Sequence, residues 1–413
     1  VTIAQMMQQR GMKQPLLIGG ATTSKVHTAV KIEPQFDGVT VHVLDASKSV
    51  PVASALLSKT ENTFVQELRE EYQDARDKNA RKRGQKSFSD LDVIRNNTSG
   101  LNWDGYAPKT PEFIGNKTIK DYPLEKIRER FDWTPFFITW ELHGKYPGIL
   151  EDNVVGEEAT KLFNDANVML DKIISENLLQ CSAVIGMYPA NGIEGDQTEI
   201  YSDENRTEVV EVLNHLRQQT DRPEGRPYRS IADFVAPKST GVKDFMGGFV
   251  VTCTGAEALA KTYEDNLDDY NAILVKALAD RFAEAFAELM HEEVRKQYWG
   301  YAPEENLSNN ELISEKYQGI RPAPGYPACP EHSEKATLFK LLNAETEIGC
   351  ELTDSYAMNP ASSVSGWYFA HPEARYFALG KIDKSQVEDY AQRKGWDMNT
   401  AERWLRPALG YDD

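Results

Sequence analysis

The first 60 residues contain two short strand-like runs, each followed by a loop and a helical segment. Residues 15–18 predict a buried strand, residues 19–24 a loop, and residues 24–32 a helix. The β-branched run 39–44 and a helix over about 50–57 repeat this order. Parallel strands are normally flanked and covered on both sides, so two of them do not make a stable doubly wound sheet alone. We therefore expect the C-terminal piece of a doubly wound α/β (Rossmann-like) domain.

A charged segment follows this piece. Residues 61–83 are rich in Glu, Lys and Arg, which predicts a solvated helix that ends near Gly84. The tract after Gly84 is rich in Ser, Asn and Gly, as is typical of a linker. The expected parts are therefore residues 1–60, a charged helix and linker over 61–104, and a second domain over 105–413.

The second domain groups its helices and strands instead of alternating them. The expected strands are 183–188 and 198–201, which form a hairpin, and runs near 249–253, 363–369 and 375–379. The longest helix is expected over 269–299, because its large apolar residues recur at every fourth position: Leu274, Leu278, Phe282, Phe286 and Met290. This grouping favours an α+β domain with a mainly antiparallel sheet and long helices.

The charge and composition exclude several classes of function. The 413 residues carry a net charge of −18, which argues against binding nucleic acid or an anionic membrane. No apolar run reaches the roughly 18 residues that a membrane-spanning helix needs. The four scattered cysteines do not suggest a disulfide framework, so we expect a reducing, cytoplasmic setting. The start has neither an initiator Met nor a secretory signal, so we expect a piece of a longer protein.

The basic residues are concentrated near the start of the chain. Residues 1–85 carry a net charge of +3, and five basic residues lie near the end of the charged helix: Arg76, Lys78, Arg81, Lys82 and Arg83. In so acidic a chain, this cluster is a candidate docking surface for an acidic protein. The alternative is an ordinary solvated helix end.

A proline-rich segment over residues 319–332 is the strongest candidate for a binding site. It has four prolines within nine positions, which predicts a rigid, extended loop. Within it, Arg321 offers a planar fork suited to a carboxylate, and Tyr326 offers a flat face suited to a base. Such a loop would fit an amino-acid nucleoside. The alternative is a stiff connector whose arginine pairs with a nearby glutamate.

The other motifs in the sequence do not identify a ligand or a reaction. The Gly19-Gly20 loop follows a strand but has neither a dinucleotide-binding nor a P-loop pattern. Cys329 and His332 have the spacing of half a zinc site, but no second pair accompanies them. No nucleophile motif is found, so no catalytic residue is assigned. The carboxylate row of Asp280, Glu284 and Glu288 is interpreted as a solvated helix face.

Four segments together resemble the C-terminal part of cobalamin-dependent methionine synthases. They are residues 16–25, 132–137, 321–332 and 365–369, in the order and approximate spacing of that family. The resemblance implies the tail of a cobalamin-binding domain over residues 1–60 and an S-adenosylmethionine-binding activation domain from about residue 105. In that family, an electron from flavodoxin or a flavodoxin-like reductase and a methyl group from S-adenosylmethionine convert cob(II)alamin to methylcobalamin. A monomer that works with the other synthase domains is implied.

The resemblance also assigns roles to individual residues. Arg321 would hold the methionyl carboxylate and Asp132 the cationic amino-acid end. The full set implied for S-adenosylmethionine is Asp132, Arg321, Gly325, Tyr326, Ala328, Tyr368 and Phe369. Two acids would lie near this pocket, Glu284 and Glu315. The residues implied for cobalamin are Gly19, Gly20, Thr22, Thr23, Ser24 and Ala46.

Several features of the whole synthase are absent from the sequence. It has no Asp-x-His-x-x-Gly motif for a cobalt-ligating histidine, no zinc site for homocysteine and no folate domain. The resemblance therefore implies only the reactivation part of a methyltransferase, with weak cobalamin binding, no metal ligands and zinc confined to the missing region. The competing hypothesis is a non-catalytic module that caps cobalamin or docks a reductase. A stand-alone methyltransferase is disfavoured, because no site for a second substrate is found.

Overall fold

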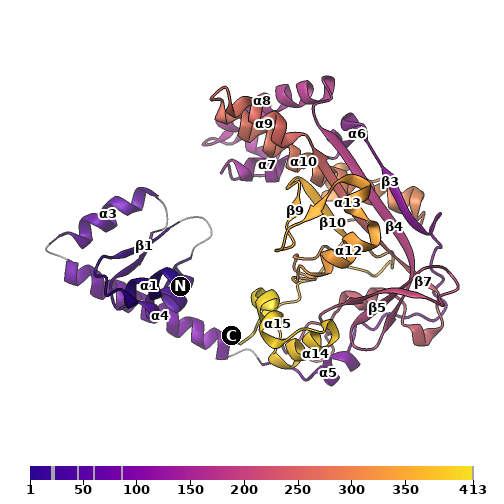
Figure 1. Ribbon diagram of the computed structural model, residues 1–413, viewed down its shortest axis with the longest axis horizontal. Coiled ribbons are helices and arrows are strands. Elements are labelled where there is room, and N and C mark those ends of the chain that lie inside the picture. The colour runs from indigo at the N-terminus through magenta and orange to yellow at the C-terminus, as the bar shows by residue number, and fades with distance from the viewer. Residues whose placement is uncertain (20–23, 44–45, 59–60, 85–86, 412–413) are drawn as a thin grey trace. The chain divides into compact units, whose positions relative to one another are not determined.

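The chain folds as two compact units, residues 1–87 and 88–413. The computed structural model describes residues 1–19, 24–43, 46–58, 61–84 and 87–411 (Figure 1). The predicted linking segment 61–104 is divided between the units. Its helix α4 (Glu61–Gly84) belongs to the first unit, and α5 (Leu91–Asn96), with buried Ile94, belongs to the second.

The first unit contains a small parallel sheet. Strands β1 (Leu16–Ile18) and β2 (Thr40–His42) are parallel, and Leu17 pairs with Val41. The other elements are helices and turns: α1 (Thr2–Gln9), α2 (Lys25–His27), a π-helical turn (Thr28–Ile32), a 3-10 turn (Glu33–Gln35), α3 (Ala46–Leu56) and α4. The parallel pair agrees with the sequence analysis, whereas the helix expected over 24–32 is a short helix and a π turn. Assignment of this unit to a cobalamin-binding domain stays a prediction.

Helix α4 packs on the first unit and is not a free connector. The Tyr72 hydroxyl accepts a hydrogen bond from the His42 backbone N–H at 2.7 Å. Arg76 forms an ion pair with Glu33 at 2.6 Å and donates to the Ala29 carbonyl at 2.9 Å. These contacts tie one face of α4 to β2 and to the turns that precede it.

The predicted basic cluster at the end of α4 is partly neutralised. Arg76 pairs with Glu33, and Lys78 pairs with Asp74 at 2.6 Å along the same helix. The side chains of Arg81, Lys82 and Arg83 lie outside the described residues. The docking role of this cluster therefore stays a prediction that rests on those three residues.

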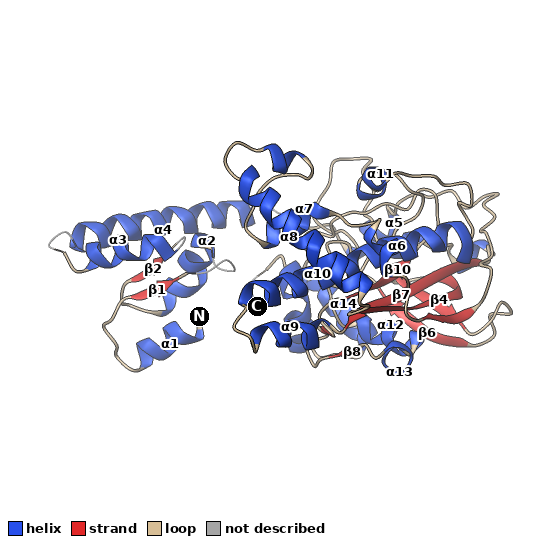
Figure 2. Ribbon diagram, turned by 90° about the horizontal axis from the view of Figure 1, so that it is seen from above, coloured by secondary structure: helices blue, strands red, loops and turns tan. Residues whose placement is uncertain are grey.

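The second unit is built on a six-stranded antiparallel sheet (Figure 2). Its strands run in the order β10-β7-β4-β5-β6, and β3 pairs with β4. Their bounds are β3 (Gly115–Ile119), β4 (Gln180–Ile193), β5 (Gln197–Tyr201), β6 (Val209–Asn214), β7 (Asp244–Thr254) and β10 (Ser363–Tyr368). A separate small pair is formed by β8 (Glu351–Leu352) and β9 (Met358–Asn359). The predicted hairpin is confirmed, because Ala190 of β4 pairs with Ile200 of β5.

Helices cover both faces of this sheet, as the alternation along β4 and β7 requires. On one face, Ile185 and Val251 pack in the core cluster that contains the large residues of α10. On the other face, Val184 and Val250 pack in the cluster that contains α12 and α13. The helices of this unit after α5 are α6 (Leu124–Arg128), α7 (Trp133–Thr139), α8 (Gly156–Ser175), α9 (Ala256–Glu264), α10 (Asp269–Glu293), α11 (Asn309–Ile313), α12 (Glu334–Leu342), α13 (Ala344–Ile348), α14 (Lys384–Lys394) and α15 (Met398–Leu405). The unit is therefore α+β.

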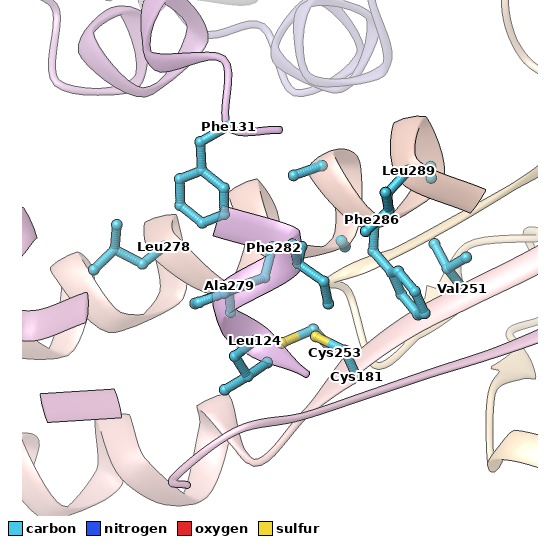
Figure 3. Packing of buried hydrophobic residues seen from close by; sticks show 14 of the residues in the cluster. Leu124, Phe131, Cys181, Val251, Cys253, Leu278, Ala279, Phe282, Phe286 and Leu289 are labelled. Atoms are coloured by element: carbon cyan, nitrogen blue, oxygen red, sulfur yellow. The ribbon is translucent and has the colours of Figure 1, made fainter. Parts of the chain in front are cut away.

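Helix α10 is the central helix of the larger core cluster. The Asp268 side chain caps its N-terminus by accepting from the Asn271 N–H at 3.1 Å. The predicted row is confirmed as buried. Phe282 and Phe286 lie near Val251 of β7 and near Cys181 and Cys253, two free cysteines that face each other across β4 and β7 (Figure 3). Beyond Glu293 the chain makes a π-helical turn (Val294–Tyr298), so the expected helix to residue 299 is regular only to residue 293.

One predicted strand is wrong. Residues 375–379 form a loop that does not join the sheet. The Leu379 N–H donates to the Pro327 carbonyl at 2.7 Å, and the Tyr376 hydroxyl accepts from the Arg321 backbone N–H at 2.9 Å. The apolar run packs against the proline-rich segment, which explains why it resembles a half-buried strand. None of the helices in the described ranges is long and apolar enough to cross a membrane.

Replacement of Phe282 by Ala should destabilise the protein by about 3–5 kcal/mol, because it empties the centre of a close-packed core. Ile273→Ala on the same helix is the matched control, since Ile273 is 53% exposed and should change stability by less than about 0.5 kcal/mol. Urea unfolding monitored by circular dichroism measures both. Equal losses for the two variants would contradict the assignment of the buried face.

Candidate functional site

A cavity of about 730 Å³ lies beside α10 in the second unit. Four parts of the chain outside the sheet form most of its wall: α10, the segment from α11 to Ala328, residues 130–135 around the start of α7, and the loop of Tyr376 and Phe377. The sheet contributes Phe249 and Val364. A volume of this size is in the range of pockets that enclose small organic ligands.

Arg321 and Glu288 form a buried ion pair in the wall of this cavity. Nη1 of Arg321 donates to Oε1 of Glu288 at 3.1 Å, and Nη2 donates to Oε2 at 2.7 Å. Burial opposes the charge on the guanidinium, but the Glu288 carboxylate more than compensates and raises the pKa of Arg321. The pair joins α10 to the proline-rich segment.

His291 supports the same guanidinium from one turn further along α10. Its Nδ1 lies 3.2 Å from Nη1 of Arg321, and its ring stacks on Tyr368 with centroids 5.2 Å apart. Complete burial, together with the charges of Arg295 and Arg321, holds the pKa of His291 well below its usual value. The neutral ring can therefore accept a hydrogen bond from Arg321 at Nδ1.

Two tyrosines complete the contacts of Arg321. The Tyr317 hydroxyl accepts from Nη1 at 3.1 Å and lies 3.1 Å from the Tyr376 hydroxyl. The Tyr376 hydroxyl in turn accepts from the Arg321 backbone N–H. Both the side chain and the backbone of Arg321 are thus fixed by neighbours.

The proline-rich segment is held as a rigid wall. The Pro322 carbonyl accepts from the Trp367 N–H of β10 at 2.9 Å, and Ile320 exchanges backbone hydrogen bonds with Phe369. Gly325 has a φ of +101°, and its N–H donates to the Cys329 carbonyl at 2.8 Å. This turn leaves the neighbouring Tyr326 side chain 56% exposed at the cavity.

The cavity carries charges of both signs. Its basic residues are Arg130, Arg281 and Arg321, and its acidic residues are Asp132, Glu284, Glu288 and Glu315, which leaves one negative charge in excess. Asp132 also caps α7, because its carboxylate accepts from the Thr134 N–H at 3.0 Å. The wall can therefore bind a ligand that has an anionic group and more than one cationic group.

The structure brings together most of the residues that the sequence analysis placed in one pocket. Asp132, Arg321, Tyr326 and Ala328 line the cavity, as do Glu284 and Glu315. Gly325 makes the turn beside them. The side chains of Tyr368 and Phe369 are buried, and Tyr368 stacks on the cavity-lining Phe249 with centroids 4.8 Å apart. Neither residue lines the cavity: Tyr368 packs on Phe249, and Phe369 is hydrogen-bonded through its backbone to Ile320.

The sequence analysis did not identify three cavity residues that contact Arg321: Glu288, Tyr317 and Tyr376. Glu288 belongs to the carboxylate row interpreted as a solvated face, but the three side chains of that row have different surroundings. Asp280 accepts from the Ser362 hydroxyl at 2.8 Å, Glu284 is exposed at the cavity, and Glu288 is buried against Arg321. The alternative hypothesis is therefore correct in that Arg321 pairs with a glutamate, Glu288.

Two of the six candidate cobalamin residues, Gly19 and Ser24, lie fully within the described residues. Gly19 directly follows β1, and the Ser24 hydroxyl caps α2 by accepting from the His27 N–H at 3.2 Å. Gly20, Thr22 and Thr23 lie outside the described residues, and of Ala46 the structure gives only the backbone at the start of α3.

The Cys329 and His332 pair has local partners. The Cys329 thiol donates to the Ala323 carbonyl at 2.9 Å, and burial raises its pKa. Nδ1 of His332 lies 3.0 Å from Nζ of Lys335. Among the described residues, no three His, Cys, Asp or Glu side chains are arranged to hold a metal ion.

Comparison with known proteins gives two concordant results. Residues 123–395 match the family described as "Vitamin B12 dependent methionine synthase, activation domain". The chain is also similar to a solved structure described as "Crystal Structure of the MetH Reactivation Domain bound to AdoHcy", at 55% sequence identity and a TM-score of 0.76. That match covers 79% of this chain and 99% of the other.

Gly325 is expected to tolerate no side chain. A Cβ at this position would lie 2.3 Å from Cε1 of His332, in addition to the cost of the positive φ. Gly241 is the matched control, because its φ is +74° but nothing lies within 4 Å of a Cβ there. Gly325→Ala should lower the thermal midpoint more than Gly241→Ala does. Equal shifts in the melting curves would show that the close approach to His332 is unimportant.

Proposed function

Because this chain belongs to the family of the activation domain of vitamin B12-dependent methionine synthase, we propose that the cavity beside α10 binds S-adenosylmethionine for the reductive methylation of cobalamin. The observation that carries this proposal is the position of Arg321. Its guanidinium is fixed by three side chains, those of Glu288, His291 and Tyr317, at the wall of a cavity of suitable volume. The similar solved structure is described as bound to AdoHcy, the demethylated form of the same ligand.

Arg321 is proposed to bind the methionyl carboxylate. A guanidinium presents planar N–H donors that match the two oxygens of a carboxylate, and such charge-assisted pairs are stronger than neutral hydrogen bonds. The raised pKa of Arg321 keeps it charged at any physiological pH. The pairing with Glu288 uses only one edge of the fork, so a second anion can still bind.

The acidic residues are proposed to favour the methyl donor over its product. S-adenosylmethionine has one carboxylate, one ammonium and one sulfonium, so its net charge is one unit more positive than that of S-adenosylhomocysteine. Asp132 would interact with the ammonium, and the exposed carboxylates of Glu284 and Glu315 add negative charge at the cavity. The negative excess of the wall complements the donor and favours release of the neutral product.

The proline-rich segment is proposed to bind the nucleoside. Tyr326 offers an exposed ring, and Ala323 and Ala328 leave room beside it. Gly325 makes the turn that places these residues along one wall. Aromatic and small side chains together form a flat slot that a purine can occupy.

The residues of this chain then bind and orient the donor. Methyl transfer from a sulfonium needs alignment with the acceptor more than acid–base assistance, so proximity and orientation carry the catalysis. In this family the cobalt of cobalamin is the methyl acceptor. Of the residues implied for cobalamin, the described ones with side-chain detail are Gly19, beside β1, and Ser24, whose hydroxyl already caps α2.

The partners follow from the family. Other parts of the synthase are proposed to bring the cobalamin to this cavity, and flavodoxin or a flavodoxin-like reductase is proposed as the electron donor. The competing hypothesis keeps the fold but has no ligand at the cavity, and serves only to cap cobalamin or to dock the reductase. The charged lining and the fixed arginine favour the first hypothesis over the second.

Arg321→Lys tests the proposal without leaving Glu288 unpaired. The lysine keeps the positive charge but loses the planar fork. We expect the affinity for S-adenosylmethionine to fall about ten- to a hundredfold, the equivalent of a charge-assisted contact of about 1.5–3 kcal/mol. Isothermal titration calorimetry measures this loss.

The control is Arg128→Lys, since Arg128 pairs with Asp171 and does not line the cavity. It should leave the affinity unchanged. If the wild-type protein shows no saturable binding of S-adenosylmethionine, the non-catalytic module is the better account. If Arg321→Lys binds as tightly as wild type, the carboxylate lies elsewhere.

A further inference from the structure

The hydrogen bonds of Arg321 are unevenly distributed over its five N–H donors. Nη1 has two protons and three acceptors close by, Glu288, His291 and Tyr317, at 3.1 to 3.2 Å. Nη2 has one acceptor, the second oxygen of Glu288, at 2.7 Å. Within the described residues, no partner is found for Nε–H or for the second proton of Nη2.

The two unused protons lie on the same edge of the guanidinium. A guanidinium can bind a carboxylate end-on, through Nη1 and Nη2, or side-on, through Nε and Nη2. Glu288 occupies the end-on edge. A second carboxylate that approaches Arg321 therefore finds only the side-on edge free.

Tyr317 restrains the orientation of the Arg321 guanidinium. Its hydroxyl contacts both the Nη1 group of Arg321 and the hydroxyl of Tyr376. Since Tyr376 accepts from the Arg321 backbone N–H, Tyr317 links the arginine side chain to a residue that fixes the arginine backbone. Rotation of the guanidinium would break the contact of Nη1 with Tyr317 as well as the pair with Glu288.

The ring of Tyr317 is itself held in place. The guanidinium of Arg295 lies 4.4 Å from its centroid, and the His291 ring meets it edge-on with centroids 4.9 Å apart. Arg295 is completely buried and paired with Glu305 at 2.6 Å, so this contact has little freedom. Burial raises the pKa of the Tyr317 hydroxyl, which therefore stays protonated at neutral pH.

We propose that Tyr317 is a positioning residue for the ligand carboxylate. Together with Glu288 it keeps Arg321 turned so that Nε–H and one Nη2–H form the recognition edge. This inference rests on the proposed binding of S-adenosylmethionine and deepens it, because it assigns the mode of carboxylate recognition. Tyr317 acts through Arg321.

Tyr317→Phe tests the proposal, because it removes the hydroxyl and keeps the ring that packs against Arg295 and His291. The ligands are S-adenosylmethionine and decarboxylated S-adenosylmethionine, which lacks only the carboxylate. Calorimetry should show an affinity for S-adenosylmethionine about two- to tenfold weaker than that of wild type, the effect of one lost hydrogen bond. The affinity for the decarboxylated ligand should not change.

The matched control is Tyr188→Phe. Tyr188 is also buried, and its hydroxyl bonds to Asn116 and to the Leu341 carbonyl, away from this cavity. This variant should lose stability without losing affinity for either ligand. An equal loss for both ligands in Tyr317→Phe would mean general damage to the pocket and would overturn the proposal, as would an unchanged affinity for S-adenosylmethionine.

A second readout uses the wild-type protein and does not depend on the folding of a variant. With ¹⁵N-labelled arginine, the Nε–H resonance of Arg321 should shift on addition of S-adenosylmethionine but not of its decarboxylated analogue. A resonance that stays unmoved by saturating S-adenosylmethionine would overturn the side-on mode. Absence of binding of either ligand to wild type would instead reject the proposed function.

Discussion

The buried ion pair between Glu288 and Arg321 is the interaction on which the candidate site depends. It joins α10, the central helix of the larger core, to the proline-rich segment, which has no regular secondary structure of its own. A buried charge is costly unless it is paired and hydrogen-bonded, and Arg321 meets both needs through Glu288, His291 and Tyr317. The close-packed core behind α10 fixes the helix, and the helix fixes the arginine that is proposed to bind the ligand.

Much of the fold follows from periodicity in the sequence. The four-residue repeat of Leu274 to Met290 identified the buried face of α10, and the strand-like runs 183–188 and 198–201 identified the hairpin of β4 and β5. The loop of residues 375–379 was mistaken for a strand, because β-propensity reports only a half-buried environment. Likewise, the charges of α4 predicted a solvated helix, whereas Tyr72 and Arg76 attach it to the first unit.

The site was predictable where it lies in one segment. The prolines and Arg321 together indicated a rigid wall with a fork for a carboxylate, and the family resemblance brought Asp132 to it. Glu288 could not be recognised in the same way, because its spacing from Asp280 and Glu284 is also that of a solvated face. Only the packing of α10, buried on most sides near Met290 and His291, shows that this carboxylate turns inward. Tyr317 and Tyr376 needed the folded chain, since 59 residues separate the two hydroxyls that meet.

The central claim is that the cavity holds S-adenosylmethionine through the free edge of Arg321. A crystal structure of the protein with this ligand tests it most directly. The account predicts that the ligand carboxylate contacts Nε and Nη2 of Arg321 while the bonds from Nη1 and Nη2 to Glu288 persist. A carboxylate that displaces Glu288 from the guanidinium, or a ligand bound without contact to Arg321, would contradict it.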